Sequence, residues 1–461
     1  MVFFRDDNKS LLVVALLVFL TRIPFLVAGY GSEEDAWGLI LVARNINLLG
    51  IYEVSRMPGH PVQEYLLSLL WDQPAWVLNL LTAIVSSAGV FCFMKTMVKL
   101  QLPNVVPCGI ALSFVPVFFI NSTNVMDYNW ALSLVMLSFY LMVSGRYLWA
   151  GIILGVACGF RITAGAMVIP FAFWHFMTHR SFKQVFISGM LTTVTAIICF
   201  FPAFKVYGST FFTYYEYFPY PPMLKNLYKG TVGAWGIPGT IAITFALVIS
   251  FRNWLRLTPS QKKSLFPVVL LCTSTILLYT YSFLRIPQKT AFVLPVIPFL
   301  ILLFALFLNK KEIILLSATM VFSCFFFGIN LDDPLRGSKT SDLSIKTHIG
   351  TTPVVFDAVS GPVIADFSKR KLKMDYATSI VNNLQTSTEK TVIIAGWWQN
   401  ELKYFSLNKQ NPLVSYLYYA DQTQLTDSIK AGNRIFFLPE QDFYNDLRFK
   451  DVFTGSLAKP F

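Results

Sequence analysis

The chain has 461 residues, of which 55% are hydrophobic and only 13% are charged, and its formal net charge is +12. Because a soluble domain carries about a quarter charged residues, this composition excludes a wholly soluble protein, and it excludes an intrinsically disordered one. The positive excess lies in short loops between apolar segments, which argues against a nucleic-acid-binding protein.

Long apolar segments fill residues 1–330, whereas residues 331–461 have almost none. A helix needs about 20 mostly apolar residues to cross a bilayer. The sequence therefore predicts a polytopic domain of about 10–11 membrane helices. The predicted single spans are 11–29, 75–98, 104–120, 127–144, 185–204, 233–251, 265–283, 291–308 and 312–330.

Three consecutive acids, Glu33, Glu34 and Asp35, directly follow the first predicted span. Adjacent like charges cost free energy unless a cation, a proton or a ligand balances them. One of these carboxylates could deprotonate an acceptor hydroxyl, or the three could hold a divalent metal. The alternative is a solvated acidic turn at a helix start. The helix expected next, over 35–49, is amphipathic, as is typical of a helix in the membrane interface.

Two more features of the outer side carry candidate functional residues. A turn rich in proline and glycine, 58–61, orients Arg56 and His60, which could neutralise a phosphate; an ordinary loop is the alternative. Asp127 begins a later span on the same side, either as a second functional acid or as a helix-start carboxylate.

The apolar stretch 147–177 is too long for one span and contains Arg161 between glycines. We expect two short or broken helices that leave and return to the same side of the membrane. An ionisable residue within the membrane indicates a functional role for Arg161. The alternative is a structural role, in which Arg161 binds backbone carbonyls that the helix break leaves without partners. Further along, 204–232 is rich in tyrosine and proline, which suits the headgroup level. Arg285 and Lys289 could face an anionic lipid.

Basic residues indicate the orientation of the spans. If the N-terminus is cytoplasmic and 147–177 returns to its own side, the short cytoplasmic loops collect most of the lysines and arginines. The positive-inside rule therefore predicts a cytoplasmic N-terminus. The C-terminal residues then face the periplasm, the cell exterior or an organelle lumen.

The C-terminal segment has the pattern of a small α/β unit. Short buried-strand patterns occur at 391–395 and 434–438, and helical patterns at 376–384, 398–405 and 423–430. Strands separated by helices favour a parallel sheet. We therefore predict a soluble α/β domain over 331–461 behind a membrane domain over 1–330.

Several of these motifs together resemble the GT-C superfamily of glycosyltransferases, and in particular its protein mannosyltransferase and aminoarabinose transferase group. The likeness covers the membrane part of the chain. The motifs that carry it are Thr21-Arg-Ile-Pro24, the acidic motif, the amphipathic helix, Gly50-Ile-Tyr, Ser55-Arg-Met-Pro-Gly-His-Pro61, the glycines of 151–161 and Phe292-Val-Leu-Pro-Val-Ile-Pro-Phe299.

The resemblance implies an enzyme that transfers a hexosyl or pentosyl group from a polyprenyl-phosphate sugar. The acceptor is a hydroxyl of a glycan, lipid or protein on the extracytoplasmic face, and the transfer inverts the anomeric centre. In the family an acid of the first outer loop is the catalytic base or a metal ligand; this position matches Asp35, with Glu34 as the next choice, and Asp127 matches a second acid. The residues expected at the donor phosphate are Arg56, His60, Arg161, Arg285 and Lys289.

The acidic motif departs from the family's usual order. The family has Asp-Glu or Asp-x-Asp, whereas this chain has Glu33, Glu34 and Asp35 in sequence. The choice of catalytic acid, and the binding of Mg²⁺ or Mn²⁺ by these three residues, therefore stay open.

Two other classes of protein remain as alternatives. A polytopic lipid or solute transporter, or a flippase, would have a similar number of helices, but such proteins usually show paired repeats with polar breaks. The sequence has one broken hairpin and no counterpart to it. A non-catalytic scaffold is the other alternative, and one span would be enough to anchor it.

Overall fold

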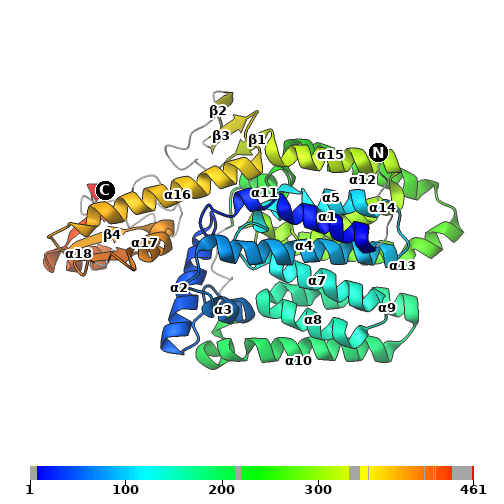
Figure 1. Cartoon of the computed structure of the whole chain (residues 1–461), viewed down its shortest axis with the longest axis horizontal. Helices are drawn as coiled ribbons and strands as arrows, with labels where there is room; N and C mark the ends of the chain where they lie inside the picture. The colour runs from blue at the N-terminus through cyan, green and yellow to red at the C-terminus, as the bar shows by residue number, and fades with distance from the viewer. Residues whose placement is uncertain are drawn as a thin grey trace.

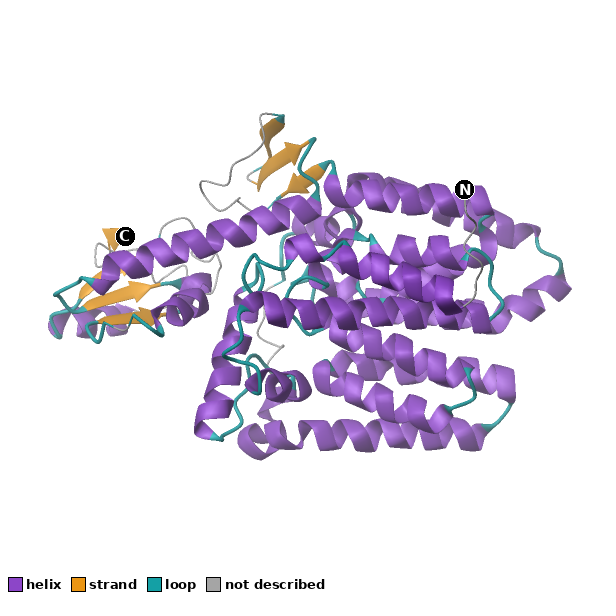
Figure 2. Ribbon diagram, viewed as in Figure 1, coloured by secondary structure: helices purple, strands orange, loops and turns teal. Residues whose placement is uncertain are grey.

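The structure is a computed structural model of the chain, and it describes residues 8–212, 220–331, 343–350, 352–409, 411–418, 420, 422–438 and 459–460. Apolar helices form a large bundle, and the C-terminal residues form a smaller layer at one end of it (Figure 1). The strands that the structure describes gather toward this end (Figure 2). Residues 213–219, which are the centre of the predicted aromatic loop, lie outside the described residues.

Five helices in the described ranges are long and apolar enough to cross a membrane, and three shorter apolar helices accompany them. The five are α1 (Asn8–Leu20) with its extension η1 (Ile23–Phe25), α4 (Ala75–Lys99), α10 (Phe182–Tyr207), α12 (Val232–Arg256) and α13 (Pro259–Arg285). The shorter ones are α7 (Tyr128–Val143), α8 (Tyr147–Phe160) and α14 (Val296–Phe307). The predicted polytopic helical fold is confirmed.

Two of the predicted spans differ most from the structure. The span over 104–120 is wrong as a single helix, because it divides into α5 (Val105–Ser113) and α6 (Pro116–Asn121). Pro116 has no amide hydrogen to donate, and its ring disfavours the helical conformation at Val115, which is extended. The span over 312–330 is too long: α15 (Lys310–Phe325) ends before strand β1 (Gly328–Asn330).

The predicted broken hairpin is confirmed. It consists of α8, the 3-10 segment η2 (Ile162–Met167) and α9 (Val168–His179). The glycines of α8 face α10 in ascending order: a Cβ on Gly151 would meet Ser188, and one on Gly155 would meet Thr192 and Thr195. Because α8 and α10 are thus parallel, the segment between them must return to the side where α8 began. Close approach through small residues is typical of membrane helices.

Helix α2 (Glu34–Leu49) lies across the end of the bundle, transverse to the long helices (Figure 1). This is the orientation expected of the predicted interfacial helix. The short helix α3 (Pro61–Ser68) packs beside it. We call this end of the molecule the α2 end of the bundle.

The C-terminal residues form two small sheets. In the first, β1, β3 (Thr352–Asp357) and β2 (Ser344–Ile349) are antiparallel, in that order; the sequence did not predict this sheet. The second sheet is parallel, as predicted, with the order β5-β4-β6-β7. Its strands are β5 (Val414–Leu417), β4 (Thr391–Ile394), β6 (Arg434–Phe437) and β7 (Lys459–Pro460).

The parallel sheet is joined to the bundle by helices. The long helix α16 (Pro362–Gln385) runs from the bundle to this sheet (Figure 1), and α17 (Gln399–Ser406) packs against α2. Tyr404 of α17 hydrogen-bonds to Tyr30, with 2.8 Å between the hydroxyl oxygens, and its ring contacts Trp37. The remaining elements are η3 (Gly208–Phe212), α11 (Met223–Gly230), η5 (Thr290–Val293), η6 (Gly396–Trp398) and α18 (Gln422–Lys430).

Candidate active site

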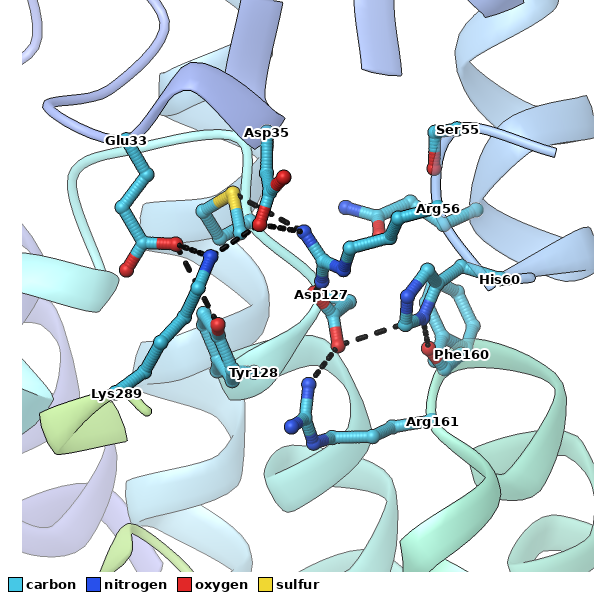
Figure 3. Close-up of polar contacts among 12 residues, drawn as sticks. Glu33, Asp35, Ser55, Arg56, His60, Asp127, Tyr128, Phe160, Arg161 and Lys289 are labelled. Atoms are coloured by element: carbon cyan, nitrogen blue, oxygen red, sulfur yellow. Dashed lines mark hydrogen bonds and ion pairs between the residues drawn. The ribbon is translucent and has the colours of Figure 1, made fainter. Parts of the chain in front are cut away.

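Charged side chains from separate parts of the chain meet at the α2 end of the bundle (Figure 3). The acids come from the start of α2 and from the residue before α7. The bases come from the loop before α3, the end of α8 and the loop before η5. The members of this charged cluster are Glu33, Asp35, Arg56, His60, Asp127, Arg161 and Lys289.

Asp127 is the buried centre of the charged cluster. Its side chain is 1% exposed and pairs with Arg56 and with Arg161, whose Nη1 lies 2.7 Å from Oδ2. Burial alone would raise the pKa of Asp127, but the two guanidinium groups hold it well below its usual range. Asp127 is therefore an ionised carboxylate that holds two arginines in place.

Asp35 lies in the more accessible part of the cluster. Its carboxylate is 29% exposed, pairs with the ammonium of Lys289, and lies 3.3 Å from Arg56. Lys289 also contacts Glu33, at 2.5 Å between Nζ and Oε2. Although burial raises the pKa of Asp35, Lys289 and Arg56 lower it below its usual range. Asp35 is thus both ionised and reachable by a ligand.

Arg161 borders a small apolar hollow on the side of the cluster toward the helices. Its guanidinium lies 4.5 Å from the ring centroid of Tyr128 and 4.8 Å from that of Phe292. The hollow, about 20 Å³ in volume, continues between α7 and α13 and is lined by Tyr279 and Leu294 among others. The aromatic rings hold the guanidinium at the boundary between the charged cluster and the apolar bundle.

His60 lies in the cluster but does not have the predicted charge. Its ring is 5% exposed, and Nδ1 lies 2.6 Å from the carbonyl oxygen of Phe160 and 3.5 Å from Asp127. Burial, together with Arg56 and Arg161, lowers the pKa of His60 to about 4, against the opposing effect of Asp127. His60 is therefore neutral at pH 7, and we revise the prediction that it supplies a positive charge to a phosphate.

Two other candidates lie apart from the charged cluster. Arg285 is the last residue of α13, its side chain is exposed, and none of the contacts described for the cluster involves it. Glu34 faces the C-terminal residues: burial and the carboxylates of Glu401 and Asp35 raise its pKa well above the usual value. Asp35 pairs with two cations, so it is a better candidate than Glu34 for an ionised acid.

The acidic motif does not form a metal site in this arrangement. Within the described ranges, no group of three or more His, Cys, Asp and Glu side chains is placed to hold a metal ion. The ammonium of Lys289 lies between the carboxylates of Glu33 and Asp35, where a divalent ion would bind. The residues present do not fit Mg²⁺ or Mn²⁺, and we derive no step through a metal.

Glu64 fixes the loop that presents Arg56, a role that the sequence did not reveal. The Glu64 side chain is fully buried and accepts hydrogen bonds from the Ser55 amide at 2.7 Å, the His60 amide at 3.2 Å and the Tyr52 hydroxyl at 2.5 Å. The only available sequence signal is an acid in the first turn of a helix, which is common. These bonds close the loop around one carboxylate.

Glu64→Gln is expected to lower the stability of the chain by about 1–3 kcal/mol, the cost of leaving a buried amide hydrogen without an acceptor. The amide of glutamine has one acceptor oxygen, whereas the carboxylate has two. Thermal unfolding in detergent measures the shift. The control is Glu53→Gln in the same loop, where one hydrogen bond, to Asn45, is at stake. Equal shifts in the two variants would show that Glu64 does not organise the loop.

Helix α16 holds both acid-bearing loops, which the sequence also did not reveal. The Lys373 ammonium donates to the Ser32 carbonyl at 3.0 Å and pairs with the buried Glu401. Arg370, which is 1% exposed, donates to the carbonyl oxygen of Thr123 at 2.8 Å. Ser32 adjoins the acidic motif and Thr123 precedes Asp127, so the C-terminal residues position both acids.

Comparison with known proteins identifies the fold. No protein-family model matches the chain, and no curated protein matches it. Among solved structures, the chain is similar to ArnT from Cupriavidus metallidurans bound to undecaprenyl phosphate, with a TM-score of 0.56 and 11% sequence identity over 95% of this chain and 94% of that chain. The apo state of the same protein gives a TM-score of 0.53 with the same identity and coverage.

The likeness to ArnT extends over both the helical bundle and the C-terminal residues. ArnT is an aminoarabinose transferase of the GT-C family. The GT-C-like fold that the sequence motifs predict is therefore confirmed. At 11% sequence identity the comparison shows the fold alone. The chemistry depends on the charged cluster.

Proposed function

We propose that this chain is an integral membrane glycosyltransferase of the GT-C type. It transfers a sugar from a polyprenyl-phosphate-linked donor to an acceptor hydroxyl on the extracytoplasmic face. The observation that carries the proposal is an ionised, partly exposed Asp35 beside Arg56 and Lys289, at one end of a bundle with the fold of ArnT. A second finding supports the donor class, because the similar ArnT structure is bound to undecaprenyl phosphate.

The cations of the cluster suit a departing phosphate. Arg56, Arg161 and Lys289 lie together around Asp127 and Asp35, and Lys289 is 27% exposed. Fixed cations stabilise negative charge that develops on a leaving group, and arginine can bind two phosphate oxygens at once. Because the leaving group is already a phosphate, the reaction requires no dedicated acid.

The transfer then follows as a single displacement. The acceptor oxygen forms a bond to the anomeric carbon while the bond from that carbon to the phosphate oxygen breaks. The bonding electron pair leaves with the phosphate, and the proton of the acceptor hydroxyl passes to the carboxylate of Asp35. One displacement inverts the configuration of the anomeric carbon.

Donor binding would make Asp35 a stronger base. In the structure Asp35 is paired with Lys289 and Arg56, which lower its pKa. A donor phosphate attracts the same two cations and weakens their pairing with Asp35. The pKa of Asp35 then rises toward its ordinary value, which favours proton transfer from the acceptor.

The pH dependence tests this exchange of partners. The kcat/KM profile reports the free enzyme, in which the lowered pKa keeps Asp35 ionised above about pH 4. The kcat profile reports the complex, in which the pKa of Asp35 is higher. We therefore expect the acidic limb of kcat to lie at higher pH than that of kcat/KM. Coincident limbs would contradict competition between phosphate and Asp35.

The orientation in the membrane is part of the proposal. The positive-inside rule favours a cytoplasmic N-terminus. Figure 1 places the first described residues and the C-terminal sheet at opposite ends of the bundle. We propose that the α2 end of the bundle, with its charged cluster, lies on the extracytoplasmic side.

Product analysis tests the activity itself. The purified chain is reconstituted in vesicles with a series of polyprenyl-phosphate sugars and candidate acceptors, and the products are identified by mass spectrometry. We expect the acceptor mass to increase by one sugar residue and the polyprenyl phosphate to be released. Movement of the lipid across the bilayer without a new glycosidic bond would instead support a flippase.

A further inference from the structure

A large cavity lies between α2 and the C-terminal residues, separate from the charged cluster. Its volume is about 610 Å³, within the range of about 300–1,000 Å³ that is typical of small-molecule sites. Gly38, Val42 and Asn45 of α2 form one wall, and Asn400 and Lys403 of α17 form another. The mechanism above uses none of these residues.

The cavity and the candidate active site lie next to each other along α2. Gly38, Val42 and Asn45 follow Asp35 by three, seven and ten residues. All four positions therefore lie along one face of this helix. Gly38 is therefore slightly less than one turn, about 4.5 Å along the axis, from Asp35. Ser55 also lines the cavity and directly precedes Arg56. A ligand in the cavity thus lies within about one helical turn of the proposed base.

The charges that line the cavity favour an anion. Three basic side chains, Arg44, Lys403 and Lys409, face one acid, Glu53, among the described lining residues. Glu53 accepts a hydrogen bond from Asn45, with 2.9 Å between Oε2 and Nδ2. Neither Arg44 nor Lys403 has an acidic partner within the described part of the chain, so positive charge remains for a ligand.

Neutral polar groups and an aromatic ring accompany these charges. Gln385, Asn400 and Tyr416 line the cavity. Packing is close at position 38, where a Cβ would lie 2.7 Å from Nδ2 of Asn400 and would displace that amide. Amides and an aromatic ring suit the hydroxyls and the ring faces of a sugar.

We propose that this cavity binds an anionic saccharide, which is the acceptor of the transfer. Its role as acceptor rests on the proposed function, whereas saccharide binding itself does not. In Figure 3, Lys289 and Ser55 lie on opposite sides of Asp35 and Arg56. The donor phosphate at Lys289 and Arg161, and the acceptor in the cavity, therefore approach from different sides of Asp35. A single displacement needs this kind of separation, because the acceptor oxygen must attack the face of the anomeric carbon opposite the phosphate.

Calorimetric titration of the full chain in detergent tests the assignment. The probes are a sulfated heparin-derived disaccharide and cellobiose, an uncharged disaccharide. We expect the sulfated probe to bind at least about tenfold more tightly, since hydrogen bonds to charged groups are stronger than neutral ones. Lys403→Glu should weaken its binding by about tenfold or more. The control is Lys430→Glu, another exposed lysine of the C-terminal segment, which is absent from the cavity lining.

Both variants alter exposed side chains, so folding is expected to be retained. Equal affinity for the two disaccharides, or equal effects of Lys403→Glu and Lys430→Glu, would overturn the assignment. A separate titration with undecaprenyl phosphate tests the donor side of the proposed function. If the lipid binds and neither disaccharide does, the cavity assignment fails and the proposed function stands; if only the sulfated disaccharide binds, the reverse holds.

Discussion

Asp35→Asn is expected to lower the rate of sugar transfer by about 10²–10⁴-fold, which is the contribution of a positioned general base. The asparagine amide has nearly the same shape as the carboxylate but cannot accept a proton from the acceptor hydroxyl. The loss should appear in kcat, measured with saturating polyprenyl-phosphate sugar, because Asp35 acts on the acceptor and not on the donor.

The affinity for the donor lipid distinguishes a variant that has lost only the base from one that has lost the donor-binding site. Asp35→Asn frees Lys289 and Arg56 from one of their acidic partners. The affinity for undecaprenyl phosphate should therefore stay the same or increase, since both cations become more available to the phosphate.

Matched variants test whether the base is Asp35 or one of the neighbouring acids. Asp72→Asn removes an exposed acid from the segment between α3 and α4 and should leave the rate unchanged. Glu33→Gln and Glu34→Gln each remove one further acid of the motif and should reduce the rate less than Asp35→Asn does. Full transfer activity in a folded Asp35→Asn protein would falsify its role, and a larger loss in Glu34→Gln would assign the base to Glu34.

The helical fold was largely predictable from the sequence, because burial in a bilayer imposes a length and an apolar composition on each span. The break after Ser113 was not, since an apolar window does not show where Pro116 interrupts the helix. The antiparallel sheet escaped prediction for a different reason. Its strand β1 is only three residues long and extends an apolar span without a change in composition.

The members of the charged cluster were also predictable, but their pairing was not. Asp35, Asp127, Arg161 and Lys289 stand out because ionisable groups near the membrane are costly and need a partner. Sequence does not say which cation contacts which acid. His60 illustrates the consequence, since its neutral state follows from burial between Arg56 and Arg161.

The residues that position the charged cluster were not recognised because their partners are distant in sequence. Lys373 and Arg370 lie on α16, where nothing in the local sequence marks them, and their contacts are with Ser32 and Thr123, more than 240 residues earlier. No local spacing encodes such a contact. It depends on how the C-terminal residues pack against the bundle.

Asp127→Ala is expected to destabilise the protein by about 3–5 kcal/mol, the usual cost of removing one partner of a buried ion pair. Asp127 is 1% exposed and neutralises both Arg56 and Arg161. After its removal Arg161 has no acidic partner among the described residues, although its guanidinium remains largely buried against Tyr128 and Phe292. The thermal midpoint in detergent, followed by circular dichroism, measures this loss.

Asp35→Asn serves as the matched control, because the same cations keep a second acid when Asp35 is neutralised. Arg56 retains Asp127, and Lys289 retains Glu33. We therefore expect the thermal midpoint to fall much less in Asp35→Asn than in Asp127→Ala. Asp35→Asn acts on the reaction instead, because asparagine cannot accept the proton. If the two variants were equally stable, Asp127 would not be the structural centre of the cluster. A stable but inactive Asp127→Ala protein that still binds undecaprenyl phosphate as the unchanged chain does would move the catalytic acid from Asp35 to Asp127.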